Sequence, residues 1–197
     1  MKTLHWVYVP VLLVFVAVFA AGCPTLVFLP DKALESAIRA EIGKPFGILT
    51  EADLLQVYEL DGRNLGIRDL SGLELCRNLA WLDLDTNKIN NLRPLEQLGR
   101  PEDPFDSPLV YLNLDDNEIS DIQPLSGLLN LQMVSLFNNQ VADIGALVTN
   151  AENGGLGAGD SVVLDANTLN DKALNVDIPT LESYGVNVSL VVPQGES

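Results

Sequence analysis

The stretch LAWLDLDTNKI at positions 79–89 carries the pattern that decides the fold of this chain of 197 residues. Leucine or isoleucine occupies its first, fourth, sixth and last positions, and asparagine occupies its ninth. The spacing recurs at 109–119 and at 131–141. Two weaker copies flank these three, one with Val162, Leu164, Asn167 and Leu169, the other with Val57, Leu60, Leu65 and Ile67, in which Gly62 and Leu65 replace the usual Leu and Asn. Five copies of a multi-point spacing indicate a repeat architecture.

The interval between copies shows where the chain can carry extra loops. The last apolar position of each copy falls at residues 67, 89, 119, 141 and 169, so two intervals are 22 residues long and the others are 30 and 28. Both long intervals contain turn-rich insertions, at 99–108 and at 150–159, the second with four glycines between 154 and 159. We expect both insertions to be surface loops that leave the stacking of repeats intact.

Each copy predicts one coil of a solenoid. The second and third Leu lie two residues apart, so on a short strand both point to the interior, which is filled only when neighbouring coils stack. The asparagines at 87, 117, 139 and 167 are expected to turn inward and bond backbone groups that the bend leaves unpaired. Cys76 stands at a Leu-like position on the opposite side of the coil, where we expect a buried small hydrophobe.

These repeats resemble the short leucine-rich repeats of bacterial internalin-type proteins. The resemblance covers 57–169 and implies an α/β solenoid of about five repeats, with a parallel β-sheet on its concave face. It also implies a helical cap before the repeats and a helix and strand cap after them. We therefore divide the chain into a signal peptide (1–22), an anchored N-terminus and helical cap (23–56), repeats (57–169), a C-terminal cap (170–192) and a tail (193–197).

Helix signals support the N-terminal cap. Leu34, Ile38 and Ile42 repeat every four residues on one helix face, and Gly43 and Pro45 end the segment. The sequence Thr50-Glu-Ala-Asp53 predicts a capping box at a second helix. In the C-terminal cap we expect a helix around 172–175, then Ile178-Pro179-x-Leu181, with Gly185 ending the last helix.

The chain begins with a targeting segment. Lys2 precedes an uncharged, mostly apolar run at 6–21, which is short for a membrane span and is interrupted by Pro10. The run ends in Phe19-Ala-Ala-Gly-Cys23, which resembles the lipobox of bacterial lipoproteins and implies cleavage after Gly22 and a lipid on Cys23. Ala20 stands where that motif usually has Leu, so secretory cleavage nearby or an uncleaved anchor stays open.

Charge and composition exclude several function classes. The net charge of −16 argues against nucleic-acid binding, because phosphates require Lys and Arg, and leaves either a basic partner or a solvated surface. The single histidine, His5, lies in the signal segment, so the exported chain would lack a Ser/His/Asp or Cys/His triad. No phosphate-binding fingerprint accompanies the Gly-rich loop, and we predict no cofactor, no metal and no enzyme, although paired carboxylates remain possible.

Residues that alternate with the core leucines should form stripes across the concave sheet. The stripes are Glu59, Trp81, Tyr111, Met133 and Ser161; Asp61, Asp83, Asn113, Ser135 and Val163; and Arg63, Asp85, Asp115, Phe137 and Asp165. Exposed aromatic and Met side chains with a charged border are typical of protein interfaces. We predict a partner-binding site made of Trp81, Asp83, Asp85, Tyr111, Asn113, Asp115, Met133, Ser135 and Phe137.

Alternatives remain for the same surface. The rings could only support the sheet, and the aspartates at 83, 85, 115, 116 and 165 could bind calcium. Our leading hypothesis is a monomeric, exported, membrane-anchored module of the cell envelope that binds a protein or peptide, and the acidic charge leaves a basic partner open. The alternatives are a self-associating structural protein of the envelope and a carbohydrate-binding module, and secretion without an anchor is the alternative localisation.

Overall fold

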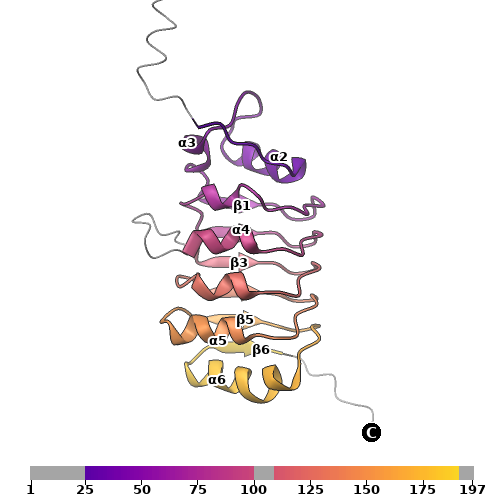
Figure 1. Ribbon diagram of the computed structural model, residues 1–197, viewed down its shortest axis with the longest axis vertical. Helices are drawn as coiled ribbons and strands as arrows, with labels where there is room; N and C mark the ends of the chain where they lie inside the picture. The colour runs from indigo at the N-terminus through magenta and orange to yellow at the C-terminus, as the bar shows by residue number, and fades with distance from the viewer. Residues whose placement is uncertain (1–24, 100–108, 191–197) are drawn as a thin grey trace, which may run out of the picture.

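A computed structural model describes residues 25–99 and 109–190, and these form the predicted leucine-rich-repeat solenoid (Figure 1). Six strands of three residues each lie side by side in chain order in one open, parallel sheet. They are β1 (Glu59–Asp61), β2 (Trp81–Asp83), β3 (Tyr111–Asn113), β4 (Met133–Ser135), β5 (Ser161–Val163) and β6 (Asn187–Ser189). The central residues Leu60, Leu82, Leu112, Val134, Val162 and Val188 pair in register.

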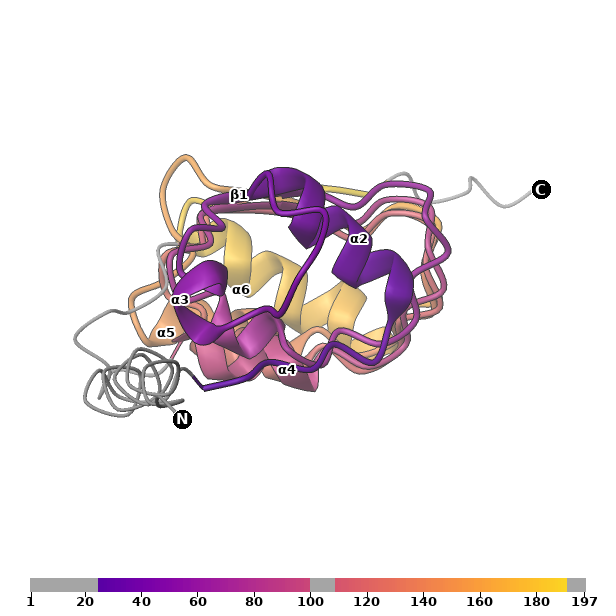
Figure 2. The ribbon, with the colours of Figure 1, turned by 90° about the horizontal axis from the view of Figure 1, so that it is seen from above.

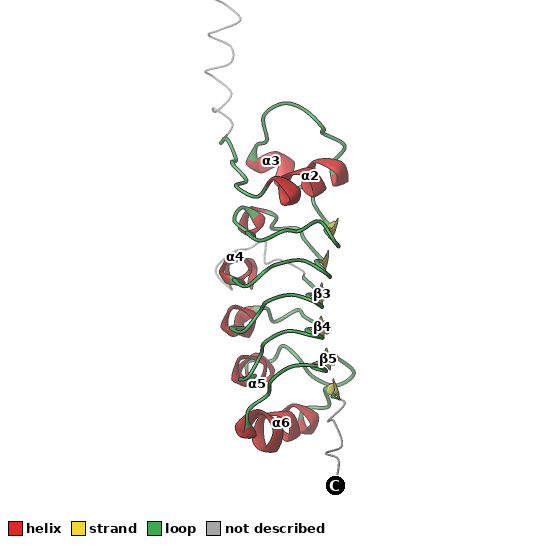
Figure 3. Ribbon diagram, turned by 90° about the vertical axis from the view of Figure 1, so that its right-hand side faces the viewer, coloured by secondary structure: helices red, strands yellow, loops and turns green. Residues whose placement is uncertain are grey.

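Short helices form the opposite layer of the solenoid, so that every coil runs from the sheet to a helix and back (Figure 3). They are η1 (Leu73–Leu75), α4 (Arg93–Glu96), η2 (Gln97–Gly99), η3 (Gln123–Gly127), α5 (Gly145–Glu152), η4 (Ala173–Asp177) and α6 (Ile178–Ser183). Between the layers lies one continuous core, which contains most of the repeated Leu, Ile and Val positions and also the buried Cys76, with Leu169 and Val188 partly buried against it.

The first repeat departs from the others, as its sequence indicated. A Cβ atom at Gly62 would lie 2.8 Å from Cδ2 of Leu84, so the Leu84 side chain occupies the space of the missing leucine. Leu65, which stands where the other coils have asparagine, is 46% exposed and does not belong to the core. The Leu65 backbone N–H donates instead to the side chain of Asn87 in the following coil.

The inward asparagines join each coil to the one before it. Nδ2 of Asn117 donates to the carbonyls of Leu84 and Leu114, at 3.0 and 3.1 Å, and its Oδ1 accepts from the N–H of Ile89 at 2.9 Å. Asn87, Asn139 and Asn167 make the equivalent bonds, each to its own coil and to the preceding one. The predicted structural role of these side chains is therefore confirmed.

The N-terminal cap covers the first end of the core, with α2 (Lys32–Glu41) and α3 (Glu51–Leu54) lying across it when the solenoid is seen from above (Figure 2). The predicted capping box between Thr50 and Asp53 is present. Asp31 accepts from the N–H groups of Ala33 and Leu34 in α2, and from those of Arg68 and Asp69 in the first coil. Burial would raise the pKa of Asp31, but these four donors outweigh it and the pKa is lowered. One carboxylate thus fastens the cap to the repeats.

The C-terminal cap differs in detail from the prediction. Its helix is not confined to 172–175: η4 is a turn of π-helix that runs directly into α6, with Pro179 in the first turn of α6. Gly185 ends α6 with a φ of +87°, as predicted, and a Cβ there would lie 2.9 Å from Cα of Ala158. The chain then adds β6 as the last strand.

The second insertion begins later than the sequence suggested. Asn150 belongs to α5 and is fully buried, so the 150–159 boundary is wrong. Its Nδ2 donates to the carbonyls of Leu125 and Leu128, and its Oδ1 accepts from the N–H of Leu156 at 2.8 Å. Leu156 itself is buried, so the Gly-rich loop packs against the helix that it follows.

Several predictions fall on parts of the chain outside the described residues. These are the signal peptide (1–22), the lipid site Cys23, the first insertion from residue 100 onward and the tail (193–197). Within 25–99 and 109–190, no helix has the length and apolar character needed to cross a membrane.

We expect Asn117→Ala to lower the free energy of unfolding by about 2–4 kcal/mol, because each buried group left unpaired costs roughly 1–3 kcal/mol. Urea unfolding followed by circular dichroism measures this change. Leu65→Asn is the matched control at the equivalent position, where no inter-coil bonds are made by the side chain, and should change stability by less than about 0.5 kcal/mol. An Asn117→Ala protein as stable as the parent would contradict the structural role of the asparagines.

The residue before each inward asparagine has a positive φ, as has Asn64 before Leu65 at the equivalent position of the first coil. The five residues Asn64, Thr86, Asp116, Asn138 and Ala166 have φ values between 51° and 58°. Asn and Asp tolerate this region, whereas a β-branched residue there is strained. Thr86→Asn should therefore raise the free energy of unfolding by about 0.5–1 kcal/mol. Thermal unfolding should show the gain, and Thr168→Asn, at a site without positive φ, should show none.

Candidate functional site

The concave sheet brings the predicted stripes together in the expected order. Trp81 pairs with Tyr111 and Tyr111 with Met133, although the first two residues are 30 positions apart in the sequence. Asp83, Asn113 and Ser135 form the second stripe on β2, β3 and β4. Asp85, Asp115 and Phe137 follow two residues beyond the same three strands. The nine predicted partner-binding residues thus come from three neighbouring coils.

Trp81 and Tyr111 form the central feature of this face. Their rings are stacked, with centroids 5.2 Å apart and an interplanar angle of 11°. Both side chains, and Met133 beside them, are half-buried rather than freely exposed as the sequence suggested. The rings therefore support one another across the sheet and still present part of their surface to solvent. Phe137, at 40% exposed, is the most accessible of the predicted apolar residues.

Two of the nine predicted residues are not accessible. Asp83 and Ser135 are each only 5% exposed, so the prediction that they line an open surface is wrong. Ser135 lies beneath Asp115, to whose Oδ1 it donates a hydrogen bond of 2.6 Å. Asp83 accepts from the N–H of Asp85 and faces the Arg63 guanidinium. Both side chains support their neighbours instead of meeting a partner.

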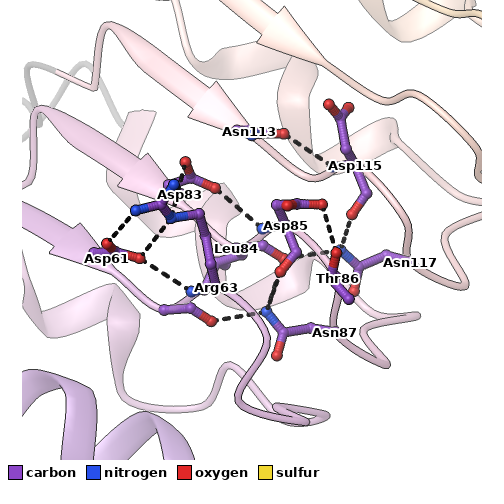
Figure 4. A network of polar contacts seen from close by, with 11 residues as sticks. Asp61, Arg63, Asp83, Leu84, Asp85, Thr86, Asn87, Asn113, Asp115 and Asn117 are labelled. Atoms are coloured by element: carbon purple, nitrogen blue, oxygen red, sulfur yellow. Dashed lines mark hydrogen bonds and ion pairs between the residues drawn. The ribbon is translucent and has the colours of Figure 1, made fainter.

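Arg63 places a cation at the N-terminal end of the acidic face (Figure 4). Its Nε and Nη2 atoms lie 2.9 and 2.7 Å from the two carboxylate oxygens of Asp61, and its Nε lies 3.7 Å from Asp83. The hydrogen bonds from Arg63 hold the pKa of Asp61 below its usual range. Arg63 was placed in the third stripe but not in the predicted site. Aligning the stripes did not reveal its role, because the long Arg63 side chain reaches from the third stripe to Asp61 and Asp83 in the second.

Asp115 lies near the middle of the face and has an unusual environment. Its Oδ1 accepts from Ser135 and, at 2.7 Å, from the N–H of Phe137. Burial, together with the nearby charges of Asp85 and Asp116, raises the pKa of Asp115 despite these hydrogen bonds. The charges at 85, 115 and 116 leave this part of the surface negative, and a cationic group from a partner would relieve their mutual repulsion.

The described residues do not support the calcium alternative. No group of three or more Asp, Glu, His or Cys side chains within 25–99 and 109–190 is arranged to hold a metal ion. The aspartates instead accept hydrogen bonds from protein neighbours, such as Asn138 to Asp116 and Ser189 to Asp165. Cys76 is buried, and its burial raises the pKa of the thiol to about 12, which makes the reactive thiolate scarce at neutral pH.

Comparisons with known proteins agree with the repeat assignment. The family model for Leucine Rich repeats (2 copies) matches residues 109–149. No curated protein sequence matches the chain. Among solved structures, an internalin (InlF) from Listeria monocytogenes superposes with a TM-score of 0.61 at 21% identity, over 87% of this chain and 60% of the internalin chain. This likeness establishes a shared fold.

Two further structures match less closely. Internalin C2 from Listeria monocytogenes has a TM-score of 0.39 and 24% identity over 85% of this chain and 97% of its own. The CBM51-2 and INT domains of Clostridium perfringens ZmpB, solved in complex with GlcNAc, have a TM-score of 0.40 and 30% identity over 49% of this chain and 19% of theirs. The chain thus spans about three fifths of the first internalin structure, with which it shares its fold.

The raised pKa of Asp115 predicts a definite dependence of stability on pH. Between its ordinary value of 3.8 and the raised pKa, the folded chain binds the proton more tightly than the unfolded chain does. The stability of the parent relative to Asp115→Asn should therefore fall as pH rises through this window. Urea unfolding at a series of pH values measures the difference. Asp61→Asn is the control of opposite sign, because the pKa of Asp61 is lowered and its stabilisation is lost as pH falls.

Proposed function

We propose that this chain is a non-catalytic binding module, exported and anchored to the envelope membrane at Cys23, that captures a protein or peptide on the concave face of its solenoid. The observation that supports it most directly is the Trp81–Tyr111 stack, half-buried at the centre of the sheet and bordered by Met133 and by carboxylates. Aromatic and Met side chains set among polar groups are typical of the energetic centre of protein interfaces.

The charge of the face suggests the chemistry of the partner. Asp85, Asp115 and Asp116 lie together beyond the ends of β2 and β3, while Arg63 offsets part of the charge of Asp61 and Asp83 at the other end. We infer that the partner presents Lys or Arg side chains to Asp85, Asp115 and Asp116. We also infer that it presents apolar side chains to the rings of Trp81 and Tyr111. A cation placed beside the Trp81 indole would gain both the attraction of the ring and that of the carboxylates.

The ring geometry favours a protein partner over a carbohydrate. A sugar usually stacks on an open aromatic face, but one face of each ring in the Trp81–Tyr111 pair is covered by the other ring. The neighbours on the outer sides of the pair are Glu59, which pairs with Trp81, and Met133, which pairs with Tyr111. Such a mixed polar and apolar stripe suits a polypeptide. The alternative of a carbohydrate-binding module therefore ranks below protein capture.

A pull-down from native cell-envelope extract, with the full chain as bait, tests this function. Replacing both Trp81 and Tyr111 with Ala should weaken capture of the specific partner by at least about 30-fold, since a central aromatic contributes roughly 2 kcal/mol or more. Titration of the captured protein by calorimetry gives the affinity. The double variant should remain folded, because neither ring belongs to the buried core of the solenoid, and circular dichroism checks this.

Tyr184→Ala is the matched control, because Tyr184 is 44% exposed at the end of α6, in the C-terminal cap and away from the strands of the site. It should capture the same partner as the parent. Equal capture by the double variant and the parent would show that the concave rings are not the binding site. Capture of further copies of this chain alone would favour the self-associating alternative.

A further inference from the structure

The N-terminal cap carries exposed apolar side chains that the solenoid does not use. Residues 25–27 and 49–51 pair as a short antiparallel ribbon, flanked by 28–29 and by 48, with a bridge between Leu26 and Thr50 and a bond of 3.0 Å from the N–H of Val27 to the carbonyl of Leu49. One face of the ribbon is buried through Leu29 and Leu49. Alternation places Leu26, Phe28 and Ile48 on the other face, where they are 65, 77 and 64% exposed.

A neighbouring loop adds a fourth side chain to this surface. Phe46, at 85% exposed, lies between Pro45 and Gly47 in the loop that returns from α2 to the ribbon. Nη1 and Nη2 of Arg39 donate to the carbonyls of Lys44 and Gly47, at 3.1 and 2.9 Å. Lys44 is held in turn by Asp53, at 2.7 Å. The loop is thus braced at both ends in the conformation that presents the Phe46 ring to solvent.

We propose that these four residues, the cap patch Leu26, Phe28, Phe46 and Ile48, insert into the interfacial layer of the lipid bilayer that holds the N-terminus of the chain. Exposed clusters of large apolar side chains mark contact surfaces, and Phe, Leu and Ile are suited to the boundary between headgroups and acyl chains. The proposal rests on the anchoring that the proposed function includes, but not on partner capture at the concave face.

The position of the patch along the chain selects the bilayer as its occupant. Leu26 follows Cys23, the expected lipid site, by three residues, which span at most about 10 Å even when fully extended. An uncleaved apolar run at 6–21 would leave the patch close to the membrane surface as well. Either anchor therefore holds the cap patch near the lipid headgroups.

The distribution of charge agrees with this placement. Residues 25–56 contain three basic and five acidic side chains, whereas 57–197 contain seven basic and 22 acidic ones. Residues 25–56 therefore carry a net charge of −2 and residues 57–197 one of −15, so an anionic bilayer would repel the cap less than the remainder of the chain. Lys32, whose Nζ lies 5.3 Å from the centre of the Phe28 ring, places a cation at the edge of the patch, where it pairs with Glu35 at 2.7 Å.

Tryptophan quenching by brominated lipid tests the proposal on the full chain. Phe46→Trp places a reporter in the patch, and Leu174→Trp places a matched reporter in the C-terminal cap, where Leu174 is 37% exposed. Each protein is reconstituted in vesicles of phosphatidylethanolamine and phosphatidylglycerol with brominated phosphatidylcholine, and the fluorescence of the parent chain is subtracted. The added signal at 46 should shift to the blue and lose most of its intensity, while that at 174 should be unaffected.

Several outcomes would overturn the proposal. An unquenched reporter at 46, with the emission of a water-exposed indole, would show that the patch does not meet lipid. A blue shift without quenching would mean that protein covers the patch: a second copy if the shift depends on protein concentration, or the chain's own apolar segment if it does not. If the parent chain did not float with the vesicles, the chain would not be anchored to the bilayer, and the proposal would fail with the anchor. Partner capture by the concave face is measured separately and can succeed in each case.

Discussion

The structure depends on one constraint: no coil of the solenoid can fill its own interior or pair all of its own backbone groups. A strand of three residues and a short helix enclose a space that is filled only by the side chains of stacked coils. Their bends leave backbone groups that only a side chain from the next coil can reach. Asn117 meets this need by bonding the carbonyls of Leu84 and Leu114, one in each of two coils. Apolar packing and polar pairing therefore fix the same register.

This register also produces the candidate site. Because the inward positions belong to the core, the alternating outward positions line up from coil to coil. Residues far apart in the sequence therefore become neighbours on the surface. Trp81 and Tyr111 are separated by the first insertion, yet their rings stack. The contacts of a partner would thus depend on the stacking of β2, β3 and β4 and not on any local motif, which is why a search for short functional motifs is uninformative for such a chain.

The sequence was sufficient for the repeat, the strand register and the inward asparagines, since these follow from spacing, and its helix signals located the N-terminal cap. It was insufficient where a side chain reaches beyond its own position. Asp83 was expected to be exposed, but the long Arg63 side chain and the backbone of Asp85 surround it. Asn150 was assigned to a loop because its burial depends on carbonyls of the preceding coil. The cap patch was missed altogether, because the exposure of Phe46 depends on how Arg39 braces its loop.

Asp31 also lies on the path that a mechanical load would take through the molecule. Its two carboxylate oxygens accept hydrogen bonds from different parts of the chain. Oδ1 accepts from the start of α2, and Oδ2 accepts from the first coil. A solenoid tethered by its N-terminus and pulled through a bound partner transmits the load through the junction of cap and repeats. There Asp31 links the two parts, and its bonds to the N–H groups of Arg68 and Asp69 carry load from the cap to the first coil. Acid, which protonates the carboxylate and weakens those bonds, would lower the force at which the junction yields.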